Sequence, residues 1–528
     1  MKKRFFFFVL LSLACRMSVA QTHITISNPE TWTAQELAPY VGQTVIFDVP
    51  MVVTANYNTI RISPRRLFIP TNQAEPLSTE YLNLMTLNSK GSVALSGVSG
   101  YHRCGEKIYN LKAYIGSTSS ISFSSGEWRG NSRADLLKGI PDVGDYRLLI
   151  CAMNLEYYIV EKPDPTSSMG PDSYAEHQDQ RTKVKQALAL INADAYGLVE
   201  IEKGQAALAE IASDLNSAHP ERRYTYIADN TVSEGTYTKA GYVYDSLKLK
   251  PFGDLLGVKS GTIGAERHRM QCFTEKATGE RFIFSLNHFK AKSGSGSGAD
   301  ADQGDGQKQF NSMRTGEAKD VVKLYESFTS GTKEKDLLLM GDLNAYAKED
   351  PIRVFLEKGL IDLHREFHAD SSYSYSFDNQ AGYLDHAICN NTMLGQVTGM
   401  AGFHINSDED DRYTYDGKKN DGSMFRCSDH DPVVVGLKLD STIVPESHAM
   451  SINTLDVLSG SATSLIISNA FQENTHSFYS IHTVSGLLLR REAITSAYHE
   501  VQLPVTPGVY ILYIYFEGRV YQEKFIVP

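Results

Sequence analysis

The sequence of 528 residues predicts an α/β protein with a β-rich region before and after its central part. Three observations predict this. Buried-type strands alternate with helices from about residue 146 to residue 440, as in layered α/β structures. Short β-rich runs between turn residues fill residues 21–145, and alternating strands fill residues 452–528. At roughly 150 residues per domain, the length also predicts more than one domain.

The composition excludes a disordered or fibrous chain. Apolar residues make up 42% and charged residues 21%, which are ordinary values for globular proteins. Lys and Arg together number 51 against 62 Asp and Glu, a net charge of -11. The chain as a whole therefore does not attract polyanions. If it handles phosphates, it needs metal ions or a local basic groove.

The first 20 residues have the pattern of a signal peptide. A basic start at Lys2–Arg4 precedes a short apolar run, Phe5–Ala14, and Ser18–Ala20 supplies a small-x-small cleavage site. We expect cleavage after Ala20 rather than lipid attachment at Cys15. Elsewhere the sequence lacks the uninterrupted run of about 18 apolar residues expected of a membrane helix.

Residues 21–145 read as an accessory β-domain. The runs Gln43–Asp48 and Met51–Thr54 are typical strands between turn residues. Val41–Val45 resembles the opening strand of OB-like domains, with an unspecific β-domain as the alternative. Five cysteines follow the signal segment, so at least one is unpaired, and without CxxC spacing we expect small core residues at Cys104, Cys151, Cys272, Cys389 and Cys427.

Residues 146–440 carry the α/β pattern, residues 441–451 form a linker, and residues 452–528 form a separate β-sandwich. Helices are expected at Lys183–Ile191 and Gln205–Leu215, and a mobile loop at Ser293–Gln307, which is rich in Gly and Asp. Strands are expected at Arg147–Met153, Gly197–Ile201, Arg281–Leu286, Asp336–Met340, Leu384–Ile388 and Val433–Leu439.

A polar cluster follows each of five strands. These clusters are Asn154–Glu156, Glu200–Glu202, Asn287–His288, Gly341–Asn344 and Ser428–Pro432. Carboxylates, amides and histidines recur, whereas the Gly-x-Ser-x-Gly turn of a serine hydrolase is not found. Oxygen ligands with neutral imidazoles suit a hard cation and a water nucleophile. The sequence thus predicts metal-assisted hydrolysis of a phosphoester.

From Tyr146 to Leu439 the sequence resembles the endonuclease/exonuclease/phosphatase superfamily, and more closely its secreted bacterial nucleases. The motifs are Gly341–Ile352, Asp302–Gln307 with Asn311 and Arg314, Tyr383–His386 and Ser428–Pro432. The resemblance implies a four-layered α/β/β/α sandwich as the catalytic domain, flanked by the N-terminal β-domain and an immunoglobulin-like C-terminal sandwich.

The resemblance also implies a role for each polar residue. Metal binding falls to Glu200, Asn154 and Asp429. Catalysis falls to His430 as general base, Asp385 fixing its tautomer, Asp342 polarising water, Asn344 donating to phosphate or water, and His288 stabilising the phosphorane. Phosphate contacts are expected from Arg314 and from Arg269 in the basic run Arg267–Arg269, for which a solvated pair of arginines is an equal alternative. We expect His386 to be a core histidine and Asp431 a cap or loop residue, and Glu202 either to lie behind the metal ligands or to face solvent.

The expected protein is a secreted nuclease of low sequence specificity that depends on Mg²⁺, with Mn²⁺ or Ca²⁺ as alternatives. DNA is the expected substrate, and RNA stays open. A first rival keeps the fold but hydrolyses a phospholipid or a phosphorylated sugar, and a second is a non-catalytic surface-binding protein. The oligomeric state is open, with a monomer assumed.

The C-terminal segment resembles the sorting domain of type IX secretion. The resemblance rests on Val484–Arg490, Pro507–Tyr515 and Lys524–Pro528. It implies passage through the periplasm of a Gram-negative bacterium, the type IX machinery as a partner, and release or display at the cell surface. An ordinary accessory sandwich is the alternative.

Overall fold

The computed structural model describes residues 21–161, 169–229 and 237–439, and the segments 456–461, 464–468, 478–483, 487–494, 498–502, 508–516 and 519–527. The predicted signal peptide (1–20) and linker (441–451) lie outside the described residues. The chain divides into two compact units. The first comprises residues up to Arg66 together with Leu87–Gly130, and the second comprises Leu67–Thr86 and the chain from Asn131 onward. We call Leu67–Thr86 the excursion.

The first unit is a β-barrel. Its strands are β1 (Thr22–Ile24), β2 (Thr44–Phe47), β3 (Met51–Ala55), β4 (Ile60–Ser63), β5 (Val93–Ser96), β6 (Lys107–Ile115) and β7 (Ser120–Arg129), with a 3-10 helix, η1 (Ala34–Tyr40). The order β6-β3-β4-β5-β7 is closed by pairing of β7 with β6, and β5 runs parallel to β7. Trp32, Phe47 and Ile108 fill the core. A closed ring of five strands is the architecture of OB-like domains, and the expected β-domain is confirmed.

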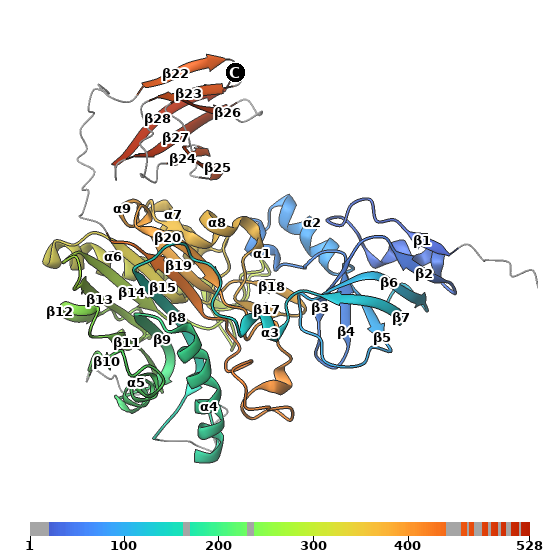
Figure 1. The fold of residues 1–528 in the computed structure, drawn as a ribbon, viewed down its shortest axis with the longest axis horizontal. Coiled ribbons are helices and arrows are strands. Elements are labelled where there is room, and N and C mark those ends of the chain that lie inside the picture. The colour runs from blue at the N-terminus through green and yellow to red at the C-terminus, as the bar shows by residue number, and fades with distance from the viewer. Residues whose placement is uncertain are drawn as a thin grey trace, which may run out of the picture. The chain divides into compact units, whose positions relative to one another are not determined.

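Two six-stranded sheets form the centre of the second unit (Figure 1). The first has the order β10 (Tyr224–Tyr226), β11 (Thr238–Asp245), β9 (Ala195–Glu202), β8 (Leu148–Tyr158), β21 (Val433–Leu437) and β20 (Val397–Gly402). The second has the order β12 (Leu249–Gly257), β13 (His268–Glu275), β14 (Arg281–Asn287), β15 (Leu337–Asp342), β19 (Asp385–Cys389) and β16 (Ile361–Asp362).

The sheets pack face to face and helices cover their outer faces. Ile150 and Val199 of the first sheet share one core cluster with Phe284 and Met340 of the second. A Cβ at Gly197 would lie 2.7 Å from the ring of Phe284, so only glycine lets the sheets approach this closely. The covering helices are α4 (Tyr174–Ile191) and α5 (Ala206–Ala218) on the first sheet, and α6 (Asn311–Thr332) and α7 (Asp350–Glu357) on the second. The four-layered α/β/β/α sandwich is confirmed.

Shorter elements complete the described chain. They are α1 (Pro70–Gln73), α2 (Thr79–Asn88), α3 (Arg133–Leu136), η2 (Ala265–Arg267), η3 (Gly298–Asp300), α8 (Leu363–His368), η4 (Ala369–Ser371), α9 (Asn391–Leu394), η5 (Asp411–Tyr413) and the hairpin of β17 (Tyr375–Phe377) and β18 (Gln380–Gly382). Among the described helices, none is long and apolar enough to cross a membrane.

Two sheets follow in the C-terminal segment. One is β22 (Asp456–Ser461), β23 (Ser464–Ser468) and β26 (Tyr498–Gln502), and the other is β25 (Leu488–Ala493), β24 (Phe478–Thr483), β27 (Gly508–Phe516) and β28 (Arg519–Val527). This pair of sheets is the expected all-β architecture. Part of the sorting resemblance, residues 484–486, 507 and 528, lies outside the described residues.

The structure extends two of the expected elements. The helix expected at Lys183 begins at Tyr174, where the hydroxyl of Ser173 accepts a hydrogen bond from the backbone N–H of Glu176 at 3.3 Å and caps it. The strand expected to end at Met153 continues to Tyr158. Among the described residues, the five cysteines after the signal segment are buried and form no disulfide, as expected of small core residues.

Candidate active site

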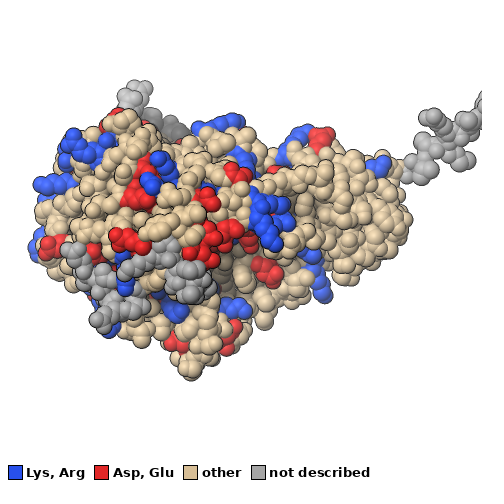
Figure 2. Space-filling view, turned by 90° about the horizontal axis from the view of Figure 1, so that it is seen from below, with Lys and Arg blue, Asp and Glu red and all other residues tan. Residues whose placement is uncertain are grey.

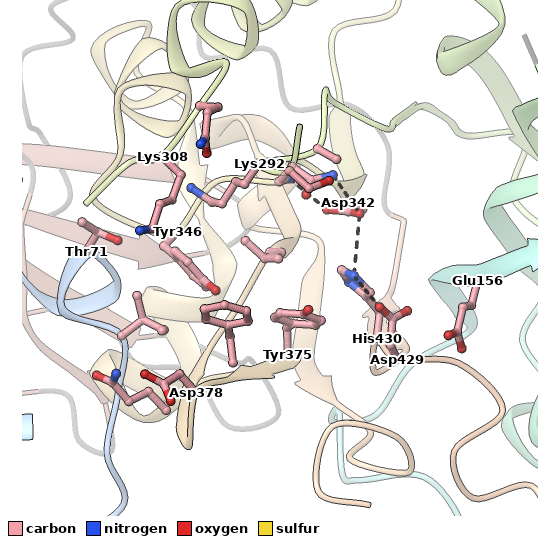
Figure 3. A pocket seen from close by; sticks show the side chains of 18 of the residues that line it. Thr71, Glu156, Lys292, Lys308, Asp342, Tyr346, Tyr375, Asp378, Asp429 and His430 are labelled. Atoms are coloured by element: carbon pink, nitrogen blue, oxygen red, sulfur yellow. Dashed lines mark hydrogen bonds and ion pairs between the residues drawn. The ribbon is translucent and has the colours of Figure 1, made fainter. Parts of the chain in front are cut away.

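The polar strand ends of both sheets meet at a single pocket. Strands β8 and β9 are parallel, as are β14 and β15, so their carboxyl ends reach the same edges of the two packed sheets. Figure 3 shows side chains from these ends and from the loop before β21 around the cavity. The cavity has a volume of about 1120 Å³, and its described lining residues all belong to the second unit.

His430 is held in a buried pair with Asp385. Its Nδ1 lies 2.7 Å from Oδ2 of Asp385, and the hydroxyl of Ser374 donates to the same oxygen at 2.7 Å. The ring of Tyr375 lies 4.8 Å from the imidazole, centroid to centroid. Burial lowers the pKa of His430, but neighbouring carboxylates, first of all that of Asp385, outweigh it and hold this pKa well above its usual range. The pair fixes the ring with Nε2 toward the pocket.

Asp342 stands opposite that nitrogen. Its Oδ2 lies 3.9 Å from Nε2 of His430 and accepts hydrogen bonds from the side-chain amides of Asn154 and Asn344, each at 3.1 Å. The backbone N–H of Asn344 donates to Oδ1 at 2.8 Å. Asn344 has a φ of 47°, a conformation that asparagine tolerates better than most residues. Burial raises the pKa of Asp342 to about 6, against the lowering effect of His430.

Glu200, near the end of β9, and His288, directly after β14, complete the cluster. Nε2 of His288 lies 3.4 Å from Oε1 of Glu200 and 3.7 Å from Oδ2 of Asp342. Burial raises the pKa of Glu200 to about 7, and the negative charge of Asp429 adds to the rise. Burial also holds the pKa of His288 well below its usual range. A neutral imidazole among carboxylates can donate a hydrogen bond or bind a metal ion.

The donor set fits a hard divalent cation. Glu200, His288 and Asp342 offer ligand atoms within 4.8 Å of one another, and so do Asp342, Asp385 and His430. Burial, the largest cause of the raised pKa values of Glu200 and Asp342, disfavours their charged forms in the absence of a cation, and carboxylate oxygens are the ligands that Mg²⁺ prefers. Glu200 and Asp342 are therefore the carboxylates that would hold the ion. The metal roles of Glu200, Asn154 and Asp429 stay predictions.

The predicted phosphate contacts of Arg314 and Arg269 need correction. Arg314 is fully buried on α6, and its guanidinium donates to the backbone carbonyls of Gln307 and Gln309, both at 2.7 Å. Arg269 is buried and paired with Asp229. A guanidinium engaged in this way holds the surrounding chain and does not face a substrate. The sequence could not reveal this engagement of the two arginines. The position of Arg314 on a helix and of Arg269 in a basic run does not tell whether either side chain turns inward or toward the pocket.

His386 and Asp431, which were not expected to act in catalysis, have protein partners, and Glu202 is buried and does not face solvent. Glu202 accepts hydrogen bonds from the backbone N–H groups of Val160, at 2.8 Å, and Glu161, at 2.6 Å. Nε2 of His386 lies 2.7 Å from the carbonyl oxygen of Ala345. Asp431 accepts from the backbone N–H groups of Asn406, at 2.8 Å, and Ser407, at 2.9 Å.

Several lining residues were given no role by the sequence analysis. Glu156 and Tyr157 have φ values of 50° and 56°, where β8 bulges into the pocket. Burial raises the pKa of Glu156 to about 8, and its Oε2 has no hydrogen-bond partner among the described residues. Lys292 and Lys308 flank the expected glycine loop, and the ring of Tyr375 lies tilted beside the imidazole of His430. Left-handed backbone at non-glycine residues carries no sequence signal, but the two lysines bracket a recognisable loop.

Comparison with known proteins finds similar folds only. No protein-family model and no curated protein matches the chain. An endonuclease/exonuclease/phosphatase from Bacteroides vulgatus is 13% identical over 56% of this chain and 99% of its own, with a TM-score of 0.37. A mannosyl-6-phosphatase from Bacteroides thetaiotaomicron is 18% identical over 55% of this chain and 100% of its own, with a TM-score of 0.36. TDP2 of D. rerio, complexed with a single-strand DNA product, is 14% identical over 55% of this chain and 99% of its own, with a TM-score of 0.36. The structural neighbours thus include proteins of the endonuclease/exonuclease/phosphatase family.

Proposed function

We propose that the protein is a divalent-metal-dependent hydrolase of phosphodiester bonds, with nucleic acid as its substrate. One observation carries the proposal. The His430–Asp385 pair points its free ring nitrogen at a buried group of carboxylates, with Asp342 at 3.9 Å. A base beside a cation site is the combination that activates water for attack on phosphorus.

The side chains divide the work as follows. Asp385 accepts the Nδ1 proton and leaves Nε2 of His430 to exchange a proton with water. Because the carboxylates hold the pKa of His430 well above its usual range, Nε2 acts as the base only at a pH where it is unprotonated. His288 and the amide of Asn344 can donate hydrogen bonds to the phosphate oxygens as negative charge develops there. When bound, Mg²⁺ supplies positive charge for those oxygens, with Mn²⁺ and Ca²⁺ as alternatives.

The nuclease assignment is supported by the way two motifs pack together. The side-chain amide of Gln307 donates to Asp350 at 3.1 Å, Asn311 donates to the same carboxylate at 2.7 Å, and the backbone N–H of Asp350 donates to Gln307 at 2.8 Å. The segments that resemble the nuclease branch, Asp302–Gln307 and Gly341–Ile352, thus form one wall of the site. DNA is the proposed substrate, and RNA is the alternative nucleic acid.

A second candidate is a phosphatase acting on a small phosphorylated sugar. The acidic character of the pocket favours it, since a carboxylate-rich cleft repels a long polyanion. The acidic lining residues are Glu156, Asp172, Glu176, Glu200, Asp302, Asp342, Asp378, Asp416 and Asp429. In Figure 2, acidic side chains gather in the middle of the visible face, with a group of basic side chains beside them.

The test measures hydrolysis by the purified full chain. Plasmid DNA, RNA, bis(p-nitrophenyl) phosphate and mannose 6-phosphate are each incubated with Mg²⁺, with Mn²⁺ and with excess chelator. We expect metal-dependent cleavage of the diesters and loss of it in His430→Asn. The control is His219→Gln, a partly exposed histidine outside the pocket lining. Hydrolysis of the monoester alone would favour the phosphatase, and no hydrolysis with either metal would contradict both candidates.

We also propose that the protein is exported and then sorted to the cell surface or medium. The predicted signal at residues 1–20 and the type IX resemblance after residue 452 support this. Deletion of residues 452–528 should leave active enzyme in the periplasm. Normal surface or medium levels of the truncated enzyme would make the segment an accessory sandwich instead.

A further inference from the structure

We propose that Lys292 and Lys308 form an anion subsite that binds a second phosphate of the substrate, next to the phosphate under attack. The proposal rests on the proposed function and deepens it, because it makes the preferred substrate a strand with more than one phosphate. A lone phosphate ester would leave the subsite empty.

The distribution of charge along the pocket suggests the subsite. Among the described lining residues, Lys292 and Lys308 are the only lysines, and no arginine lines the pocket. Figure 3 shows both near Thr71 and Tyr346, whereas Asp342, Asp429 and His430 lie at the other end of the labelled set. The pocket thus has one end where Asp342, Asp429 and His430 gather, and another where the ammonium groups of both lysines lie together with the carboxylates of Asp302 and Asp378. A substrate with two separated negative groups matches both.

Lys292 is held at the pocket wall. Its ammonium pairs with the buried carboxylate of Glu349, donates to the carbonyl oxygen of Gln307 at 3.1 Å, and lies 5.1 Å from the centroid of the Tyr346 ring. These two acceptors leave one of the three ammonium donors for a ligand. Burial lowers the pKa of Lys292 to about 8, and an added phosphate would favour its charged form.

Lys308 is the more accessible member. Its side chain is 55% exposed, and its Nζ is 3.7 Å from the carboxylate of Asp302, a separation that leaves the ammonium available to a stronger acceptor. The backbone here is well fixed, because buried Arg314 binds the carbonyls of the residues on either side, Gln307 and Gln309. Arg314, which was first expected to bind phosphate, instead fixes the backbone that carries Lys308, and Lys308 can bind phosphate.

The excursion supports both lysines. The hydroxyl of Thr71 donates to Glu349 at 2.9 Å, and Glu349 in turn holds Lys292. Tyr81 packs against the glycine loop before Lys308: a Cβ at Gly306 would lie 2.5 Å from the Tyr81 hydroxyl oxygen. Thr71 and Tyr81 are thus positioning residues for the subsite, although they belong to a segment between β4 and β5 of the barrel.

Phosphate is the anion that this chemistry favours. Two ammonium groups present compact point charges, which serve phosphate oxygens without the planar geometry that a guanidinium imposes. Successive phosphates of a strand would put one at the carboxylate cluster and the next at the lysines. A contact of this kind makes binding depend on salt, with a slope of about 0.7 per phosphate for single strands.

The experiment compares TpT, which has one phosphate, with TpTpT, which has two, and uses Lys308→Gln in the full chain with Mg²⁺ or Mn²⁺. We expect wild type to prefer TpTpT in kcat/KM, and Lys308→Gln to lower that preference at least fivefold, roughly the effect of one charged contact. The salt slope for TpTpT should become shallower by about 0.7. Lys323→Gln, at an exposed lysine on α6 paired with Asp320, is the matched control.

Thr71→Val is the second variant, because it removes the hydroxyl that holds Glu349 while keeping the side-chain shape. It should lower the TpTpT preference in the same direction as Lys308→Gln, but less. Equal losses on TpT and TpTpT in Lys308→Gln, or an unchanged preference, would overturn the subsite. Failure of the proposed function looks different, since wild type would then cleave neither compound with either metal.

Discussion

Replacing Asp385 by Asn tests the pair that orients the proposed base. In the wild type, one carboxylate oxygen accepts from Nδ1 of His430 and from the hydroxyl of Ser374, both at 2.7 Å. An amide can present only one acceptor atom, and its nitrogen is a donor. If the amide nitrogen faces the ring, Nδ1 must accept and the proton moves to Nε2. The nitrogen that should receive a proton from water is then already occupied.

The size of the effect follows from the role of the base. General-base catalysis contributes about 10²- to 10⁴-fold, so we expect kcat/KM to fall at least about a hundredfold. That corresponds to about 2.7 kcal/mol of lost transition-state stabilisation. The substitution also weakens buried hydrogen bonds, which would lower the free energy of unfolding by about 1–3 kcal/mol. A chain of this size should remain folded.

The assay is hydrolysis of bis(p-nitrophenyl) phosphate with Mg²⁺ or Mn²⁺, together with the Tm of each variant. Asp362→Asn is the matched control, because Asp362 is also buried and accepts hydrogen bonds from the hydroxyl of Tyr383, at 2.8 Å, and the backbone of His364, at 3.0 Å. It does not belong to the described pocket lining. Turnover near the wild-type level in folded Asp385→Asn, or an equal loss in Asp362→Asn, would refute the assigned role.

The remaining predictions concern the base, the metal, pH and the backbone. His430→Ala and Asp342→Ala should each lower diester hydrolysis at least about a hundredfold, on plasmid DNA, while Tm changes little. Excess chelator should abolish hydrolysis, and Mg²⁺ or Mn²⁺ should restore it; restoration by Zn²⁺ alone would speak against a hard-cation site. The pKa of Glu200 is raised to about 7 and that of Glu156 to about 8, so without metal their contribution to stability is complete below about pH 4.5 and is lost as pH rises through these values. The increase in Tm caused by saturating Mg²⁺ should therefore grow from pH 6 to pH 8, and a constant increase would contradict the placement of the ion. Gly341→Ala should lower Tm, because φ is 124° and the new Cβ would lie 2.1 Å from the backbone oxygen of Asn287; an unchanged Tm would show that β14 and β15 can separate there.

Strand positions were the easiest feature to predict from the sequence. Strands buried on both faces are continuous apolar runs, and the run before Asp342 and the run before Glu200 each end where a polar side chain enters the site. The pairing of His430 with Asp385 could not be derived from spacing, since 45 residues separate them. Resemblance to a family supplied that pair, and the structure brings the two side chains together.

The incorrect predictions have a common physical origin. Arg314 and Arg269 were selected for their charge, but a guanidinium serves equally well to bind backbone carbonyls or a buried carboxylate. Which role it takes depends on whether the helix or strand turns the side chain inward, and both of these are buried. Lys308, with a left-handed backbone and an exposed side chain, gave no periodic signal at all.

The excursion, Leu67–Thr86, connects two strands of the barrel but supplies residues to the pocket of the second unit. The chain leaves the barrel after β4, supplies Thr71, Tyr81 and Met85 to the pocket lining, and returns to the barrel at β5. Phe68 also bridges to Ala381, beside the hairpin that carries Tyr375. Because these contacts lie within the second unit, a truncated chain that begins at residue 146 would lack part of its own substrate wall. Such a truncation would remove the hydroxyl that holds Glu349 and the ring that packs on the glycine loop, while leaving His430, Asp385 and Asp342 in the chain. The segment between β4 and β5 therefore belongs to the wall of the pocket, whereas no described lining residue comes from the barrel itself.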